Sequence, residues 1–371
     1  MAIIHPWMPQ YRTKFFSLLV SELEARGVEL VIFYGETPPE WKERNDSASP
    51  EYCIELDTRF RSIGGRSIAA KSLVEFYRHG PYDLIVLEQA IRNLETYRLF
   101  ASRTTRSAIA FWGHGKTYTA RKNLFEEWFK LFLTRRTRWF FAYTQGGVDA
   151  LVAGGFDSRR TTVVQNSTDT ELLKDALATV SSADVDRFRL EHRLGEDLCV
   201  YIGGIDSAKR IPFLLDAAHA CYRSNPKFHL VIIGAGDLSK HVKESSEAFS
   251  YISYLGAVFG FEKAVALKAC RLMLIPGRVG LVAVDSLVAG SPIVTTDWPY
   301  HAPEFEYLED GVTALVASDS VDGYSKTVLE ILADGRRLSE LSANCIDVGS
   351  EFSAERMAMR FSVGVMDALD V

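Results

Sequence analysis

The chain has 371 residues, of which 47% are hydrophobic and 24% are charged. This balance is typical of globular proteins and excludes a collagen-like, coiled-coil or largely disordered chain. The length predicts two domains at about 150 residues each. The formal net charge of −6 argues against nucleic acid as the main partner, because phosphate binding requires a basic surface.

The cysteines and the N-terminal residues predict the compartment. Five cysteines are spread along the chain, and no two lie at a metal-ligand spacing. We interpret them as free thiols in a reducing compartment. The first residues lack the basic and apolar regions of a signal peptide, and no apolar stretch approaches the ~20 residues of a membrane span. The sequence therefore predicts a cytoplasmic protein.

Charge is divided unevenly between the two halves. Residues 1–180 carry 24 Lys and Arg against 21 Asp and Glu, whereas residues 181–371 carry 18 against 27. This asymmetry indicates two modules with different partners.

In the first half, short apolar runs alternate with amphipathic stretches. Strands are expected at 1–4, 28–34, 84–87, 108–112, 139–144 and 163–166. Helices are expected at 12–26, 121–134 and 145–155, with a long irregular insertion at 36–66. Strands separated by helices predict a parallel sheet with helices on both faces.

A polar, helix-prone segment at about 169–196 precedes a second alternating pattern. Strands are expected at 199–204, 228–236, 251–256, 271–277 and 291–296, and helices at 211–224, 261–270 and 279–290. The predicted fold class is therefore α/β, with two Rossmann-like domains facing a cleft. Ligands of such sheets bind beyond the carboxyl ends of the strands.

The segment 276–311 contains the clearest candidate site. A helix is expected to begin at Val279-Gly280-Leu281, and the free amides and positive dipole end of a helix N-terminus bind anions. Arg278 adds a guanidinium suited to phosphate, and Asp285 can accept two ribose hydroxyls. The alternative is an ordinary βα unit with a solvated aspartate.

Two further strands end in glycine turns. Gly203-Gly204 is followed by Lys209-Arg210, two cations that suit a diphosphate, although a surface charge pair is the alternative. Gly234 and Gly236 form the second turn. The dinucleotide fingerprint is absent, because the residue three positions after Gly236 is Ser239.

Residues 199–316 resemble the donor-nucleotide domain of the retaining glycosyltransferases of family 4 (glycosyl transferases group 1), which have the GT-B fold. The resemblance rests on the order and spacing of several short motifs. These are Gly203 with Lys209, Gly234 with Gly236, Gly280-Leu281 with Asp285, Ala289-Gly290-Ser291-Pro292-Ile293, Pro303-Glu304 and Asp310-Gly311.

The resemblance implies roles for these residues. Lys209 would hold the donor diphosphate as a catalytic residue together with Arg210, and the amides of Gly280 and Leu281 would bind the same group. Asp285 would replace the ribose-binding glutamate of the family. The remaining donor-side residues implied are Gly203, Gly204, Gly234, Gly236, Arg278, Val279 and Glu304.

Two positions depart from the family pattern. Gly277 stands where the family has a glutamate that contacts the donor sugar. Gly204 stands where an arginine is expected, with Arg210 or Arg278 as candidates to supply that cation. His301, in the same loop as Glu304, is either a site residue or a turn histidine.

The first half resembles the family more loosely. Gln10 and Arg12 match the opening loop on the acceptor side, and His114 follows a predicted strand where the family has a histidine facing the donor sugar. The alternative for His114 is an ordinary loop histidine. The predicted domains are an acceptor-side domain at 1–168 and a nucleotide-sugar-binding domain at 169–350, with a C-terminal helix at 351–371 crossing back.

The activity implied by the resemblance is a metal-independent hexosyl transfer with retention of configuration. The donor would be a nucleoside diphosphate sugar, and the acceptor would be a hydroxyl of a glycan or of a lipid-linked molecule. No cofactor is expected, and the setting implied is bacterial glycan or polysaccharide assembly. The rival hypotheses are a sugar-nucleotide epimerase of the same fold and a non-catalytic nucleotide-sugar-binding protein.

Aromatic and basic residues are interleaved at 121–138, with Arg121 and Lys122 at the start of this segment. Such a helix can lie on an anionic membrane surface, which would place the protein at the inner face of the membrane. The alternative is a core-facing helix with snorkelling cations.

Overall fold

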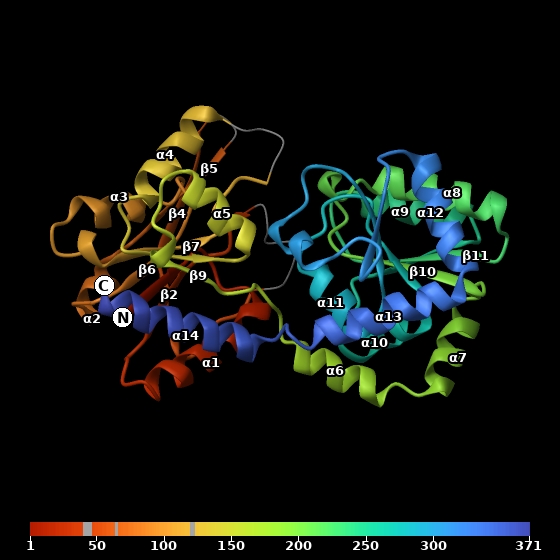
Figure 1. The fold of residues 1–371 in the computed structure, drawn as a ribbon, viewed down its shortest axis with the longest axis horizontal. Coiled ribbons are helices and arrows are strands. Elements are labelled where there is room, and N and C mark those ends of the chain that lie inside the picture. The colour runs from red at the N-terminus through yellow and green to blue at the C-terminus, as the bar shows by residue number, and fades with distance from the viewer. Residues whose placement is uncertain (40–46, 64–65, 119–122) are drawn as a thin grey trace. The chain divides into compact units, whose positions relative to one another are not determined.

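The computed structural model describes residues 1–39, 47–63, 66–118 and 123–371. The chain divides into two compact units: unit 1 contains residues 1–168 and 354–371, and unit 2 contains residues 169–353. Each unit is built on one parallel sheet with flanking helices, so both have the α/β architecture (Figure 1).

The sheet of unit 1 has seven strands in the order β3-β2-β1-β6-β7-β8-β9. These strands are β1 (Ala2–His5), β2 (Val31–Gly35), β3 (Cys53–Leu56), β6 (Ile85–Glu88), β7 (Ile109–Gly113), β8 (Trp139–Ala142) and β9 (Thr161–Val163). The helices between them are α1 (Gln10–Glu24), α2 (Val74–His79), α3 (Leu94–Ala101), α4 (Leu124–Thr134) and α5 (Gln145–Ala153).

The last helix, α14 (Ala354–Asp370), packs within unit 1 against α1 (Figure 1). Its buried residues recur at helical spacing, which produces one apolar face. On that face Phe361 stacks on Phe141 of β8 with ring centroids 4.2 Å apart, and its edge meets Phe15 of α1. Residues 354–371 therefore complete the core of unit 1, although the whole of unit 2 precedes them in the chain.

The sheet of unit 2 has six strands in the order β12-β11-β10-β13-β14-β15. They are β10 (Asp197–Ile202), β11 (Phe228–Ile233), β12 (Ile252–Gly256), β13 (Leu272–Leu274), β14 (Ile293–Thr296) and β15 (Ala314–Ala317). The helices are α6 (Thr170–Thr179), α7 (Ser182–Glu191), α8 (Ile211–Ser224), α9 (Ser239–Ala248), α10 (Gly260–Ala269), α11 (Val282–Ala289), α12 (Val321–Ala333) and α13 (Gly335–Gly349).

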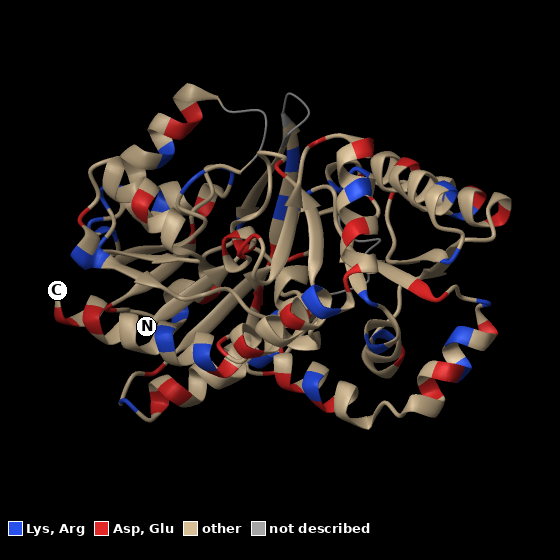
Figure 2. Cartoon of the chain, turned by 45° about the vertical axis from the view of Figure 1, so that its right-hand side comes forward, with Lys and Arg blue, Asp and Glu red and all other residues tan. Residues whose placement is uncertain are grey.

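Charged residues lie mainly on the helices, whereas the strands of both parallel sheets are largely uncharged (Figure 2). In the six strands of unit 2, all of which lie in the described part of the chain, the charged residue is Asp197 at the start of β10. Strands covered by helices on both faces have continuous apolar runs, which is why the sequence pattern predicted most of these strands; β3 and β15 were not predicted.

The structure corrects three predicted elements. The insertion at 36–66 is not irregular throughout: it contains β3 and β4 (Thr58–Ile63), and β4 pairs with β5 (Arg66–Lys71) in an antiparallel hairpin. The helix expected from 121 begins at Leu124, because the side chain of Asn123 caps it. Arg121 and Lys122 lie outside the described residues.

The third correction concerns the helix expected from Val279, which begins at Val282. Backbone groups of Val279 bond to the loop at 301–302 instead of entering the helix. The predicted anion site is therefore a loop leading into a helix rather than a first helical turn.

Candidate functional site

The order of strands reverses beside β10 in unit 2, with β11 and β12 on one side and β13, β14 and β15 on the other. Ligands of open α/β sheets bind at the carboxyl ends of strands at such a reversal. The loops that follow β10 and β13 are residues 203–206 and 275–281. They contain six of the predicted donor-side residues: Gly203, Gly204, Arg278, Val279, Gly280 and Leu281.

Lys209 is fastened to the loop after β13. Its ammonium donates to the carbonyl oxygen of Arg278 at 2.5 Å, and the amide of Arg278 donates to the carbonyl of Ala208 at 3.0 Å. A Cβ atom at Gly277 would lie 2.5 Å from the carbonyl carbon of Lys209. The structure thus brings Lys209 and Arg278 together and closes position 277 to any side chain.

Two amides of the same loop are open. Within the described part of the chain, the amides of Gly280 and Leu281 donate to no acceptor, whereas that of Val279 donates to Nδ1 of His301 at 3.1 Å. Protein packing does not demand a glycine at 280, since a Cβ atom placed there would lie 3.8 Å from its nearest neighbour, the Cβ of Ala302. These amides precede the N-terminus of α11, in the loop to which the ammonium of Lys209 bonds, an arrangement that suits an anion.

The glycines at 203, 234 and 236 serve backbone packing. A Cβ atom at Gly234 would lie 1.8 Å from the carbonyl oxygen of Gly203, and one at Gly236 would lie 2.5 Å from that of Ile205. The amide of Gly203 donates to the carbonyl of Ile233, and that of Gly234 to the carbonyl of Gly256. The amide of Gly236 donates to the hydroxyl of Ser239. Gly204 is exposed, and its carbonyl accepts from the hydroxyl of Tyr201 at 2.5 Å. These glycines let the turns after β10 and β11 touch.

Arg210 is paired within unit 2. Its backbone has a left-handed conformation with φ 55°, at the junction with α8. Its guanidinium bonds to Asp319, donates to Oγ1 of Thr296 at 3.3 Å, and lies 4.4 Å from the ring centroid of Phe213. The structure therefore gives Arg210 a counterion and an anchoring role beside the site.

The two predicted carboxylates have different environments. Oδ2 of Asp285 accepts from Nζ of Lys263 at 2.8 Å, and both side chains are mostly buried. Sequence reasoning did not predict this Lys263 partner. Glu304 lies in the 3₁₀ helix Pro303–Tyr307 and is buried. Asp285 therefore has one carboxylate oxygen, Oδ1, outside its ion pair.

His301 is buried and uses both ring nitrogens. Nε2 lies 2.9 Å from the carbonyl oxygen of Thr296, and Nδ1 accepts from the amide of Val279. Because a carbonyl only accepts, Nε2 carries the proton and the ring is neutral. Burial lowers the pKa of His301; the hydrogen bond to Thr296 opposes this shift, and the charges of Lys209 and Arg278 add to it. The sequence left this role open, since nothing local indicates either partner.

Of the three predicted site residues in unit 1, His114 and Gln10 are exposed and Arg12 is buried. His114 is exposed after β7, with its ring centroid 4.9 Å from that of Tyr143. Gly115 has φ 74°, and a Cβ atom there would lie 2.3 Å from the carbonyl oxygen of Gly147. This close approach fixes the His114 loop on α5. Gln10 is exposed at the first residue of α1.

Arg12 faces the interior of unit 1. It is 2% exposed and donates to Oδ1 of Asn166 at 2.6 Å. Its guanidinium lies 5.1 Å from the ring centroid of Trp112 and 5.7 Å from that of Tyr143. The structure therefore gives Arg12 a packing role among aromatic rings, and does not present it on the surface.

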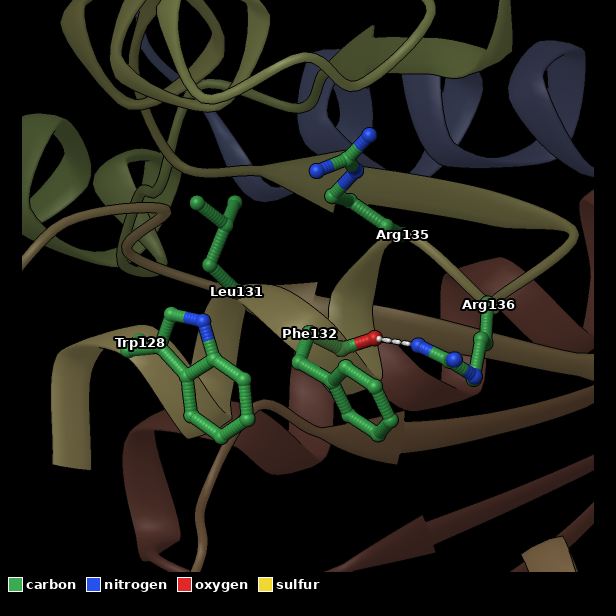
Figure 3. Close-up of a pocket in the computed structure, with 5 residues that line it drawn as sticks. All are labelled: Trp128, Leu131, Phe132, Arg135 and Arg136. Carbon is green, nitrogen blue, oxygen red and sulfur yellow. Dashed lines mark hydrogen bonds between the residues drawn. The ribbon is translucent and has the colours of Figure 1, made fainter. Parts of the chain in front are cut away.

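Helix α4 and the two residues after it form an aromatic and basic surface, which we define by Leu124, Phe125, Trp128, Phe132, Arg135 and Arg136. Leu124 is 85% exposed and Phe125 is 68% exposed. Figure 3 shows the rings of Trp128 and Phe132 side by side, with the guanidinium of Arg136 beside Phe132. A groove of about 480 Å³ is lined by Trp128, Leu131, Phe132, Arg135 and Arg136. The helix is therefore not simply core-facing.

Residues 196–334 match the family model described as Glycosyl transferases group 1. The matched residues lie within unit 2. A segment of 110 residues is 27% identical to phosphatidyl-myo-inositol mannosyltransferase of Mycobacterium leprae (strain TN), covering 28% of this chain and 29% of that protein. The alignment thus spans less than a third of that relative.

The solved structures that are similar over nearly the whole chain include HepE of Anabaena and sucrose-phosphate synthase of Thermosynechococcus elongatus. HepE of Anabaena, in complex with UDP, is 15% identical with a TM-score of 0.71, covering 99% of this chain and 100% of that chain. Sucrose-phosphate synthase of Thermosynechococcus elongatus is 16% identical with a TM-score of 0.68, covering 99% and 98%. At these identities the likeness shows the fold, which is the GT-B fold.

Neither a metal cluster nor a membrane span is found in the described ranges. No group of three or more His, Cys, Asp and Glu residues among them is arranged to hold a metal ion. No helix in those ranges has the length and apolarity to cross a bilayer. All five cysteines are free thiols.

Proposed function

We propose that the protein is a retaining glycosyltransferase that moves a sugar from a nucleoside diphosphate sugar to an acceptor hydroxyl. The observation that carries this proposal is the pair of open amides at Gly280 and Leu281 beside the ammonium of Lys209. The UDP complex of HepE supports a uridine nucleotide as the first donor to test.

The proposed chemistry depends on charge. When the bond between the sugar and the diphosphate breaks, negative charge grows on the leaving phosphate oxygen. Lys209, Arg278 and the open amides stabilise that charge, and such preorganised stabilisation is commonly the largest catalytic contribution. The leaving phosphate then accepts the proton of the acceptor hydroxyl while the new glycosidic bond forms on the same face of the sugar. No carboxylate nucleophile or metal ion is needed for this sequence.

The acceptor in this proposal is a glycan or lipid-linked hydroxyl, and the setting is bacterial glycan or polysaccharide assembly. The M. leprae relative, named for transfer to phosphatidyl-myo-inositol, supports a lipid-linked acceptor. The exposed surface of α4 supports peripheral contact with a membrane, because exposed aromatic rings and arginines suit an anionic lipid surface.

One observation favours a different function, a nucleotide-sugar-binding protein without turnover. Gly277 stands where the family has the glutamate that contacts the donor sugar, and the structure leaves no room there for a side chain. The epimerase hypothesis needs acid and base carboxylates, but Asp285 is ion-paired and Glu304 is buried.

A binding screen followed by a product assay tests the proposal. Isothermal titration with UDP, GDP and ADP is expected to show binding of at least one of them, and its sugar derivatives are then assayed with glycan and lipid-linked acceptors. Binding without any transfer favours the non-catalytic function. Release of an isomerised sugar nucleotide without an acceptor favours the epimerase. Absence of binding by all three nucleotides contradicts the site itself.

A further inference from the structure

We infer that His301 is a positioning residue, which orients the open amide of Gly280 toward the donor diphosphate without touching the donor. This inference rests on the proposed function and extends it to a histidine whose role the sequence left open. It is carried by two hydrogen bonds of the ring and one of the neighbouring backbone.

The ring of His301 joins the end of β14 to the loop after β13. Nε2 donates to the carbonyl of Thr296 at the end of β14, and Nδ1 accepts from the amide of Val279 in the loop after β13. Both ring nitrogens are therefore committed, and only the neutral tautomer with the proton on Nε2 satisfies both bonds. The ring is stacked on Phe305 with centroids 4.1 Å apart, which holds its plane.

Ala302, the residue after His301, holds the peptide between Val279 and Gly280. The amide of Ala302 donates to the carbonyl oxygen of Val279 at 2.8 Å. That carbonyl shares a planar trans peptide with the amide of Gly280, and the two groups point in opposite directions. The bond to Ala302 therefore directs the N–H of Gly280 away from residues 301–302. His301 holds the same residue, Val279, from its other side.

The charges around His301 favour the neutral ring. Lys209, Arg278 and Arg210 are the cations that face it, and Arg278 also donates to the carbonyl of Tyr300 at 3.1 Å. Their charges and burial both disfavour a second proton on the ring. The same cations that would hold a diphosphate thus preserve the hydrogen bond that orients the amide.

Two substitutions separate the two bonds. His301→Asn places an amide oxygen where Nδ1 was, so it keeps an acceptor for Val279 and loses the donor to Thr296. His301→Gln places an amide nitrogen near Nε2, so it keeps the donor and loses the acceptor. Ala302→Pro removes the N–H that binds the Val279 carbonyl, and its φ of −77° suits proline.

The measurement is isothermal titration with UDP and with uridine, after circular dichroism has shown that each variant is folded. We expect His301→Gln and Ala302→Pro to weaken UDP binding about tenfold, the size of one hydrogen bond to a charged group. We expect their affinity for uridine to stay within about twofold, and His301→Asn to retain most of the UDP affinity. His219→Gln, in α8, is the matched control.

Different outcomes contradict the two proposals. Equal loss of UDP and uridine affinity in His301→Gln, or equal loss in the Asn and Gln variants, assigns His301 a merely structural role. A wild-type protein that binds UDP no more tightly than uridine contradicts the diphosphate site, and with it the proposed function. If the Gln variant does not fold, the Asn variant decides, because loss of most of its UDP affinity would contradict a role of His301 through the amide of Val279.

Discussion

Gly277 lies directly against the backbone of Lys209, and a Cβ atom at position 277 would approach the Lys209 carbonyl carbon to 2.5 Å. Position 280, three residues along the same loop, has room for a methyl group. Two glycines of one loop therefore serve different ends. Gly277 allows the loop to close on Lys209, and Gly280 leaves open space beside an amide that donates to no acceptor in the described part of the chain.

This contrast predicts different effects of one methyl group. Gly277→Ala is expected to lower the free energy of unfolding by about 1–3 kcal/mol, the cost of forcing atoms into a packed site. Gly280→Ala is expected to fold normally and to weaken binding of UDP. Thermal unfolding and isothermal titration measure the two properties. Similar unfolding temperatures for both variants would contradict the closure at 277.

Lys209→Met is expected to reduce turnover by about 10²–10³, the size typical of removing one preorganised group from a developing negative charge. The fold should persist, because the apolar stem is kept. Lys268→Met is the control, since Lys268 also donates to a backbone carbonyl, that of Val180 at 3.1 Å. Steady-state rates with the best donor give the comparison, and unchanged turnover in Lys209→Met would count against the site.

His114→Ala is expected to lower turnover by about tenfold or more and to leave UDP affinity nearly unchanged, because a positioned imidazole acts in the reaction rather than in nucleotide binding. The exposed loop position makes the fold tolerant of this change. Rates and titrations on the same preparations separate the two effects. Equal losses in both would indicate a structural role for this histidine.

The buried imidazole of His229 is expected to make the folded protein less stable in acid. Burial, and then the charge of His192, lowers its pKa from 6.5 to about 4 in the folded state. The unfolded chain takes up a proton below its ordinary pKa while the folded chain does not, so stability falls as the pH drops from about 6.5 to about 4. His229→Gln should flatten this dependence in thermal unfolding between about pH 4.5 and 7.5. The same dependence of unfolding temperature on pH in the wild-type protein and in His229→Gln would contradict this role of His229.

The surface of α4 predicts binding to anionic lipid. Phe125→Ser with Trp128→Ser is expected to reduce sedimentation with vesicles of phosphatidylglycerol and phosphatidylcholine, and salt should reduce it in the wild-type protein. Leu190→Ser changes an exposed leucine of unit 2 as a control. Wild-type protein that does not sediment with the anionic vesicles would exclude this role for the helix.

Hydropathy along the chain was enough to predict many elements of both parallel sheets. Helix α8 has the predicted bounds, 211–224, because its apolar residues recur at helical spacing on one buried face. Five of the six strands of unit 2 were predicted, because a sheet covered on both faces needs continuous apolar runs, whereas β15 was not. The β4–β5 hairpin was not predicted, since its polar and basic residues carry little apolar alternation.

The α/β class and the glycine turns at strand ends could be inferred from the amino-acid order alone, because both depend on residues that are neighbours along the chain. Three-dimensional packing was needed to reveal that His301 holds Val279, that Lys263 neutralises Asp285 and that Arg12 is buried. Each of these contacts joins residues from separate elements of one unit. Hydrogen bonding and burial of that kind follow from the topology of the sheet, which brings distant loops to one edge.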